Sequence, residues 1–255
     1  MALIKTPEQI THIKELADVL SDLLEFSLSH VKPGISTIEL DRIIEEKMDE
    51  LQVTGPCKGY HGFPCVSCIS VNDQVTHGIP DETVLNNGDI VDIDLVIQRN
   101  GYFADMSKTI PVGPIPEDVK KLVLTAEECL EKGISKVKPG NHIGDIGFAI
   151  QDHAEKNGYS VVREYTGHFI GLEMHEDPLV PNRGKKKRGL RLKPGMVLCI
   201  EPMINMGRYE VITRGWDART FDGKYSSRCE HMVLVTQDGH EILTRQPDIH
   251  EYFSA

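Results

Sequence analysis

Long apolar runs are absent from this sequence, and their absence argues against one class of protein. No segment reaches the ~18 consecutive apolar residues that a membrane-spanning helix needs. The opening residues, MALIKTPEQI, also lack the apolar stretch of a signal peptide. We therefore expect a cytoplasmic protein with no membrane partner.

Positive charge is scarce as well. The chain has 28 Lys and Arg against 39 Asp and Glu, which gives a formal net charge of −11. Because phosphate-backbone binding depends on Lys and Arg, this composition argues against a nucleic-acid partner. One basic run covers residues 185–188 between two glycines. A solvated loop is the simpler interpretation, and a nucleic-acid or localisation patch is the alternative.

Paired cysteine motifs are few. Six cysteines without an export signal indicate free thiols rather than a disulfide framework. Cys65 and Cys68 form one CxxC pair, but no second pair completes a zinc knuckle. Strand-forming residues follow where a redox motif would begin a helix. We expect these two cysteines to pack in the structure or to line a pocket.

Helical and strand patterns alternate along the 255 residues, of which 40% are hydrophobic, enough for a substantial core. Thr6-Pro7-Glu8-Gln9 combines an N-cap, a proline at the first helical position and a capping-box glutamine. β-branched residues punctuated by turn signals predict strands over about 57–112. Apolar periodicity predicts helices over about residues 6–30, 36–51, 116–134 and 141–156.

Two segments of the first half recur in the second. SHVKPG at residues 29–34 returns as SKVKPG at 135–140, an offset of 106 residues. GDIVDID at 88–94 is echoed by GMVLCIE at 195–201, an offset of 107. We interpret these matches as two copies of a helix-helix-strand unit.

Such a repeat predicts a single domain over residues 1–255, with halves at about 5–112 and 114–248. The strands of both halves would form a shared sheet with the helices outside, an α/β (α+β) architecture. Equivalent positions of the two halves would bring Asp94 and Glu201 together near a pseudo-twofold axis.

Carboxylates interrupt the apolar strands of both halves. Asp92 and Asp94 alternate with apolar residues, and a half-exposed strand would explain them if they stood alone. However, Glu201 ends one apolar strand and Glu230 precedes another. Carboxylates gathered inside a fold repel each other unless a cation neutralises them or one stays protonated. A divalent metal is therefore the favoured interpretation.

Four carboxylates suit two ions about 3.5–4 Å apart, which together activate water and polarise a carbonyl. A histidine would complete a mixed nitrogen and oxygen ligand set, which favours Mn, Fe(II), Co or Zn over Mg or Ca. His168 is the candidate, because it has glycines on both sides, at positions 167 and 171, and no helical context. A solvent-exposed loop histidine is the alternative.

At this point the residues resemble a family. The chain is similar to type I methionine aminopeptidases over roughly residues 5–248. The motifs that carry the resemblance are VTHGIP (75–80), IDLVIQRNGYFADMSKT (93–109), TGHFIGLEMHEDP (166–178), IEPMI (200–204) and CEHMVLV (229–235). The resemblance implies the pita-bread fold, in which two pseudo-symmetric halves surround a central antiparallel sheet.

The resemblance also implies metal ligands. Asp94 would chelate the first of two divalent ions. Asp105 and Glu230 would bridge both ions, and His168 and Glu201 would hold the second. A metal-bridging hydroxide would attack the carbonyl of an N-terminal methionine, with Glu201 managing its proton. On this interpretation Asp92 is a neighbour of the ligands rather than one of them.

Two further histidines are implied to act on the substrate. His77 would lie near the scissile amide, and His175 would contact the substrate and stabilise the tetrahedral intermediate. Phe169 stands where the family usually has a glycine, and we expect it to narrow the loop of His168. The methionine pocket would be lined by Cys57, Tyr60, Phe63, Cys68 and Trp216, with Met174 and Met203 beside them.

The function implied is a hydrolase that removes methionine from nascent proteins and peptides, preferably when the second residue is small. We expect a monomer that meets its substrates transiently at the ribosome. One alternative is a proline-selective peptidase of the same fold, which would release another residue. A second is an inactive relative that binds proteins and no metal. A thiol-redox protein would leave the carboxylates unexplained.

Overall fold

The structure, a computed structural model, describes residues 3–253 and combines one layer of long helices with antiparallel sheets. Its helices are α1 (Pro7–Ser29), α2 (Thr37–Glu50), α3 (Glu117–Ile134) and α4 (Ile143–Lys156), with short 3-10 turns η1 (Tyr60–Gly62) and η2 (Ile249–Phe253). The four long helices lie close to the ranges predicted from periodicity, which are thereby confirmed.

Local capping chemistry sets where the helices begin. The Thr6 hydroxyl accepts from the Gln9 N–H, and the Gln9 side chain accepts from the Thr6 N–H, the predicted capping box. The fourth helix begins two residues later than residue 141. His142 is its N-cap, and the His142 N–H donates to Asp145 Oδ2 at 2.8 Å.

The strands fall into four antiparallel sheets. They are β1 (Cys68–Val71), β2 (Gln74–Thr76), β3 (Ile90–Arg99), β4 (Tyr102–Pro111), β5 (Ser160–Val161), β6 (Gly167–Phe169), β7 (Glu176–Val180), β8 (Val197–Ile200), β9 (Met203–Asn205), β10 (Val211–Arg214), β11 (Asp217–Thr220), β12 (Ser226–Arg228), β13 (His231–Val235) and β14 (His240–Ile242). The sheets are ordered β1-β3-β4, β10-β11-β2, β12-β9-β5 and β14-β13-β8-β6-β7.

The β3–β4 hairpin is the longest strand pair. Its register runs without interruption from Ile90 opposite Pro111 to Arg99 opposite Tyr102. A tight turn joins the strands because Asn100 and Gly101 both have positive φ, at 54° and 81°. Residues 90–97 are buried throughout, so the half-exposed strand considered from the sequence is wrong. Both faces of β3 are covered.

A short junction connects this hairpin to the strands of the second half. Lys108 on β4 forms an isolated antiparallel bridge with Cys229. Directly beside it, the Glu230 N–H donates to the Ser107 carbonyl at 2.9 Å. The junction is therefore a backbone connection between residues more than a hundred positions apart.

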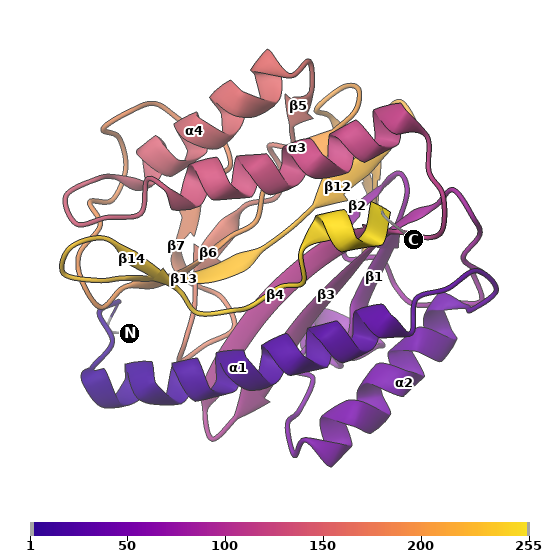
Figure 1. The fold of residues 1–255 in the computed structure, drawn as a ribbon. Coiled ribbons are helices and arrows are strands. Elements are labelled where there is room, and N and C mark those ends of the chain that lie inside the picture. Colours follow the sequence, from indigo (N-terminus) through magenta and orange to yellow (C-terminus); the bar gives the residue numbers. More distant parts are fainter. Residues whose placement is uncertain (1–2, 254–255) are drawn as a thin grey trace.

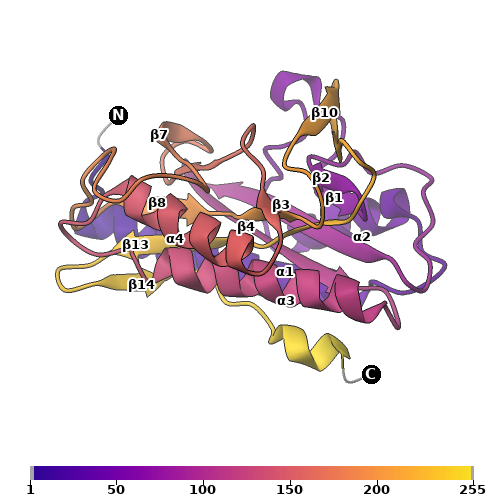
Figure 2. The same cartoon turned by 90° about the horizontal axis from the view of Figure 1, so that it is seen from above.

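The helices cover one side of the sheets. Figure 1 shows α1 and α3 running in front of the strands. α4 lies beside α3, and α2 lies near the C-terminal end of α1. Viewed from above, η2 lies outside the helix layer, whereas β10 projects from the opposite side (Figure 2). One buried cluster joins α1 and α2 to β3 and β4, and a second joins α3 and α4 to β8 and β13.

The order of two helices followed by strands thus occurs twice along the chain. The repeat of residues 5–112 and 114–248 remains an interpretation of that order. Among residues 3–253, no helix is both long and apolar enough to span a bilayer. The six cysteines are free, as predicted, and all of them are buried. Residues 185–188 lie in an exposed loop without regular structure, as the simpler interpretation of the basic run predicted.

Candidate metal centre and substrate pocket

The five predicted metal ligands converge from both halves of the chain. Asp94 lies on β3, Asp105 on β4 and His168 on β6, while Glu201 follows β8 and Glu230 precedes β13. Their exposed fractions range from 0% for Glu230 to 6% for Asp94. Strand alternation explains this placement, because the apolar neighbours of each ligand point to the opposite face and pack in the core.

Hairpin register brings the two aspartates together. Asp105 is paired with Val96, and Asp94 is paired with Ser107. Directly opposed residues share a face of the sheet, and so do residues two apart on one strand. Asp94 and Asp105 therefore lie diagonally adjacent on one face.

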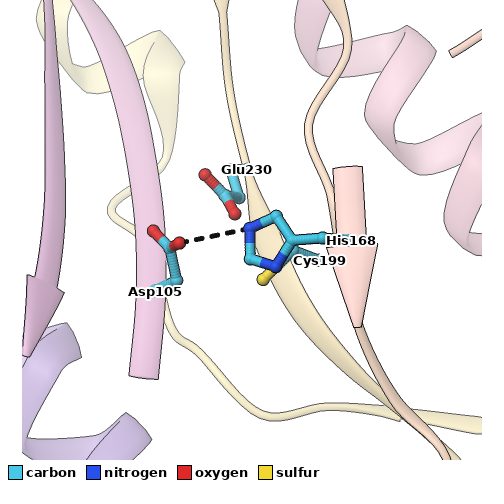
Figure 3. A group of neighbouring side chains, drawn as sticks. All are labelled: Asp105, His168, Cys199 and Glu230. Carbon is cyan, nitrogen blue, oxygen red and sulfur yellow. Dashed lines mark ion pairs between the residues drawn. The ribbon is translucent and has the colours of Figure 1, made fainter. Parts of the chain in front are cut away.

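His168 faces these carboxylates from the other half. Its Nε2 lies 3.4 Å from Asp105 Oδ2 (Figure 3). The same nitrogen lies 3.7 Å from Glu201 Oε1. Its Nδ1 lies 3.0 Å from the Phe169 carbonyl, which favours a proton on Nδ1 and leaves Nε2 free as a ligand. Burial lowers the pKa of His168, which favours the neutral form of the ring. The exposed-loop alternative is wrong.

Phe169 does not narrow the site, contrary to expectation. Because it follows His168 on β6, its ring points to the opposite face and is fully buried in the cluster that also contains Leu198 and Ile200. The close approach of β6 to β8 depends on Gly167 instead. A Cβ at Gly167 would lie 2.3 Å from the Cys199 carbonyl oxygen.

Several carboxylate oxygens at this centre are buried without a hydrogen-bond partner. They include Asp94 Oδ1, Asp105 Oδ1 and Glu230 Oε1. Burial raises the pKa of Asp105 and of Glu201 well above the usual range, and raises that of Glu230 to about 8. A buried, ionised carboxylate destabilises the fold unless a cation neutralises it or a proton binds to it. The residues therefore fit a divalent metal ion.

Ligand atoms from four residues lie within 4.8 Å of one another: Asp105, His168, Cys199 and Glu230 (Figure 3). Cys199 was not predicted as a ligand from the sequence, because it lies on an apolar strand two residues before Glu201. Burial raises the pKa of the Cys199 thiol well above its usual value. Since the thiolate is the ligating form, the imidazole and the carboxylates are the better ligands here.

Arg228 is the second residue that the sequence analysis missed. Its guanidinium is 4% exposed and lies inside the carboxylate cluster. Nη1 donates to Asp94 Oδ2 at 2.5 Å, and Nη2 lies 2.6 Å from Glu230 Oε2 and 2.9 Å from Glu201 Oε2. The available signal was its spacing, because extended residues two apart share a face and Arg228 lies two residues before Glu230.

Asp92 lies beside the cluster. It is 5% exposed, and its Oδ1 accepts from Thr109 Oγ1 at 3.4 Å. Its other oxygen lies 4.0 Å from Arg228 Nη1. Burial raises the pKa of Asp92 to about 8. This arrangement supports the prediction that Asp92 is a neighbour of the ligands.

A pocket of about 270 Å³ opens onto the cluster. All seven substrate-binding residues predicted from the sequence line it: Cys57, Tyr60, Phe63, Cys68, His77, His175 and Trp216. Met174 and Met203 line it too, together with Val96, Tyr165 and Leu179, which the sequence analysis did not select. The lining is rich in sulfur and aromatic rings, which suits a flexible thioether side chain.

Only one cysteine of the CxxC pair belongs to this pocket. Cys68 lines it, whereas the Cys65 thiol lies 3.9 Å from the Pro80 carbonyl within the adjoining apolar cluster. Burial raises the pKa of Cys65 to about 11. A thiol in this state is a poor redox nucleophile, which disfavours the thiol-redox alternative.

Two neutral histidines flank the pocket. Burial lowers the pKa of His77 and of His175 to about 4 in each case. The His175 ring lies 4.5 Å from that of His168, and its Nδ1 lies 3.3 Å from the Tyr60 hydroxyl. The His77 ring meets Trp216 edge-to-face at 5.6 Å. Neutral imidazoles can each donate one hydrogen bond to a carbonyl group.

The chain is similar to known peptidases over nearly its full length. The profile of metallopeptidase family M24 matches residues 11–237. Methionine aminopeptidase 1 of Bacillus subtilis (strain 168) is 44% identical over 247 residues, which span 96% of this chain and 100% of that protein.

Solved structures show the same relationship. The crystal structure of methionine aminopeptidase from Rickettsia prowazekii superposes with a TM-score of 0.93 at 39% identity, covering 95% of this chain and 99% of that one. The prolidase of Pyrococcus horikoshii OT3 shares the fold alone, with a TM-score of 0.77 at 22% identity, and this chain covers 64% of it. The chain therefore belongs to metallopeptidase family M24 and has the pita-bread fold.

Proposed function

We propose that this chain is a methionyl aminopeptidase that hydrolyses the first peptide bond of peptides and nascent proteins that begin with methionine. The observation that carries the proposal is that one pocket combines an apolar side-chain lining with a buried group of possible metal ligands. A sulfur-rich apolar lining leads directly to a buried cluster of carboxylates and one neutral histidine. The similarity to methionine aminopeptidases over the full chain supports the same activity.

The metal would be held by the predicted ligands: Asp94, Asp105, His168, Glu201 and Glu230. A bound divalent ion would lower the pKa of a coordinated water and polarise the scissile carbonyl. The ligand types suit Mn, Fe(II), Co or Zn. Two ions per chain remain the expectation from the sequence.

The residues of the chain itself would bind the substrate and move its protons. Trp216 and Phe63 meet edge-to-face at 5.2 Å and would enclose the methionine side chain. His77 and His175, both neutral, would donate hydrogen bonds around the scissile amide. Glu201, whose pKa burial raises, would accept a proton from the attacking water and return it to the leaving amine.

The principal competitor is a proline-selective peptidase of the same fold. The higher identity to methionine aminopeptidases favours methionine, because the prolidase is only 22% identical and much longer. The pocket also offers thioether and aromatic contacts that a proline ring does not need. An inactive protein-binding relative would have no use for a buried ligand set of this kind.

The test uses metal-stripped protein reconstituted with Mn²⁺ or Co²⁺ and incubated with Met-Ala-Ser and Ala-Pro-Ala in parallel. We expect free methionine, released only when metal is present. Free alanine would support the proline-selective alternative, and absence of both products from metal-loaded protein would support the inactive one.

A monomeric state, transient action at the ribosome, a cytoplasmic location and preference for a small second residue belong to the same proposal. Sedimentation of the metal-loaded protein would test the monomeric state. Competition among Met-Ala, Met-Val and Met-Lys peptides would test the preference for a small second residue, and we expect Met-Ala to be cleaved fastest.

A further inference from the structure

A positive side chain already lies among the proposed metal ligands. The Arg228 guanidinium donates to Asp94 and Glu230 and lies 2.9 Å from Glu201 Oε2. A further bond runs from Nη1 to the Thr76 hydroxyl at 3.1 Å. Only 4% of the Arg228 side chain is exposed, so its positive charge is balanced by the buried carboxylates and not by counterions from solvent.

The backbone holds the arginine rigidly at this place. The Thr109 hydroxyl donates to the Arg228 carbonyl at 2.7 Å and lies 3.1 Å from the Arg228 N–H. The next residue, Cys229, forms the bridge to Lys108 that joins the two halves. Arg228 therefore reaches the cluster from a position that the fold itself determines.

The guanidinium divides the oxygens of the cluster between two sides. Asp94 Oδ2, Glu201 Oε2 and Glu230 Oε2 face Arg228. On the other side, Glu201 Oε1 lies 3.7 Å from His168 Nε2, and Glu230 Oε1 has no partner. Asp105 approaches His168 and is neither hydrogen-bonded nor ion-paired to the arginine.

This division coincides with the two predicted ion positions. The first ion would use Asp94, Asp105 and Glu230, and the guanidinium bonds two of these three residues. The second ion would use Asp105, His168, Glu201 and Glu230, and each of them still has a ligand atom that is not bonded to Arg228. A guanidinium and a divalent ion cannot share the same carboxylate lone pairs at these distances.

We propose that Arg228 is a built-in cation that takes the place of the ion at Asp94, so that the chain holds one tightly bound divalent ion at Asp105, His168, Glu201 and Glu230. The inference rests on the proposed metal-dependent function. It makes Arg228 a positioning residue, which determines how many ions bind and keeps Asp94 oriented without metal. It also replaces the expectation of two ions with one.

Metal stoichiometry tests this inference directly. Metal-stripped wild type and Arg228→Gln are dialysed against graded Mn²⁺, bound Mn is counted per chain, and electron paramagnetic resonance reports coupling between ions. We expect one uncoupled Mn²⁺ in the wild type. In Arg228→Gln, a second Mn²⁺ should bind roughly 10–100-fold more tightly than in the wild type and couple magnetically to the first.

Two control variants separate this effect from general changes in charge. Arg245 also contacts two aspartates, Asp18 and Asp22, but does so at the exposed surface, and Arg245→Gln should bind one ion like the wild type. Asp94→Asn should leave the count at one, because the single ion does not need Asp94. Circular dichroism of the metal-loaded variants confirms folding, and the wild-type count alone carries the test if Arg228→Gln is unfolded.

Two coupled Mn²⁺ ions in the wild type would overturn the inference, and so would an unchanged second affinity in folded Arg228→Gln. Methionine release by the same samples separates this result from the proposed function. One bound ion without release would overturn the function alone, whereas two bound ions with release would overturn the role of Arg228 alone. Absence of any bound ion would overturn both.

Discussion

The Glu230 N–H donates to the Ser107 carbonyl at 2.9 Å, and this bond links the two halves of the chain at the metal centre. Gln246 reinforces the junction, because its side-chain amide donates to the carbonyls of both Ser107 and Glu230, at 2.9 and 2.6 Å. Asp105 lies two residues before Ser107 on the same strand face. A backbone contact between the halves thus brings two of the proposed ligands together.

The first prediction contrasts two aspartates of the β3–β4 hairpin. Asp105→Asn should abolish metal-dependent methionine release, because Asp105 belongs to the ligand group with His168 and Glu230. Asp92→Asn should leave most of the activity, since Asp92 contacts Thr109 and lies outside that group. Steady-state rates and bound metal per chain would be measured for both variants. Equal losses would contradict the assignment of Asp105 as ligand.

The second prediction concerns the pH dependence of stability without metal. Burial raises the pKa of Glu230 from 4.5 to about 8 and that of Asp92 from 3.8 to about 8. Between these limits the folded chain binds more protons than the unfolded chain, so the stability of the metal-free protein falls as pH rises. The contribution of these two carboxyl groups to the stability of the metal-free protein should be largest at about pH 4 and lost above about pH 8.

A divalent ion bound by Glu230 would replace the proton on that carboxylate and reduce the repulsion between the buried carboxylates. The increase in Tm on adding Mn²⁺ should therefore be small at about pH 5 and large at about pH 8. Scanning calorimetry with and without Mn²⁺ across this range would measure it. An increase that is the same at both pH values would count against protons and metal competing for one site.

The third prediction concerns the methionine pocket. Trp216→Ala removes the ring that packs against Phe63 and His77, and we expect kcat/KM for Met-Ala-Ser to fall roughly 10–200-fold. Trp216→Phe keeps an aromatic face and should lose less. Both variants should bind metal as the wild type does. An unchanged kcat/KM in Trp216→Ala would place methionine elsewhere.

The fourth prediction concerns His175. Its neutral ring lies beside His168 and is positioned by the Tyr60 hydroxyl at 3.3 Å. If it donates to the developing oxyanion, His175→Ala should lower kcat by about 10²–10³-fold while KM changes little. Tyr60→Phe, which removes only the positioning hydroxyl, should have a smaller effect. A loss confined to KM would indicate a binding role instead.

The fifth prediction concerns the loop that carries His77. A Cβ at the next residue, Gly78, would lie 2.2 Å from the Ile69 carbonyl oxygen. Gly78→Ala should therefore lower the free energy of unfolding by about 1–3 kcal/mol. Gly239→Ala is the matched control, because a Cβ there meets no atom within 4 Å. Chemical denaturation of both variants would measure the difference, and equal stability would contradict close packing at Gly78.

Much of the fold was predictable because its signals are local. Capping at Thr6 and helical periodicity involve residues a few positions apart, and they predicted the helices. Turn signals between β-branched residues are local in the same way, and they predicted the strand-rich region that contains the longest hairpin. α4 begins at Ile143, two residues after the approximate start predicted from periodicity, because its N-terminus is set by the contact between the His142 N–H and the Asp145 side chain.

The ligand types and their order along the chain were also readable from spacing and motif. Carboxylates within apolar strands predict a bound cation if the fold brings them together. The family resemblance then assigned each carboxylate to one or both of the metal ions. The face of β6 that carries Phe169, and hence its packing in the core, became clear only with the strand register.

The identity of the cation nearest Asp94 could not be read from the sequence in this way. Spacing places Arg228 and Glu230 on one side of an extended segment, but it does not tell whether that side meets solvent or the carboxylates of the other half. The bridge between Lys108 and Cys229 decides this, and it depends on the packing of both halves at once. Local patterns thus specified the elements and the kinds of ligand, whereas long-range pairing specified which charges meet inside the fold.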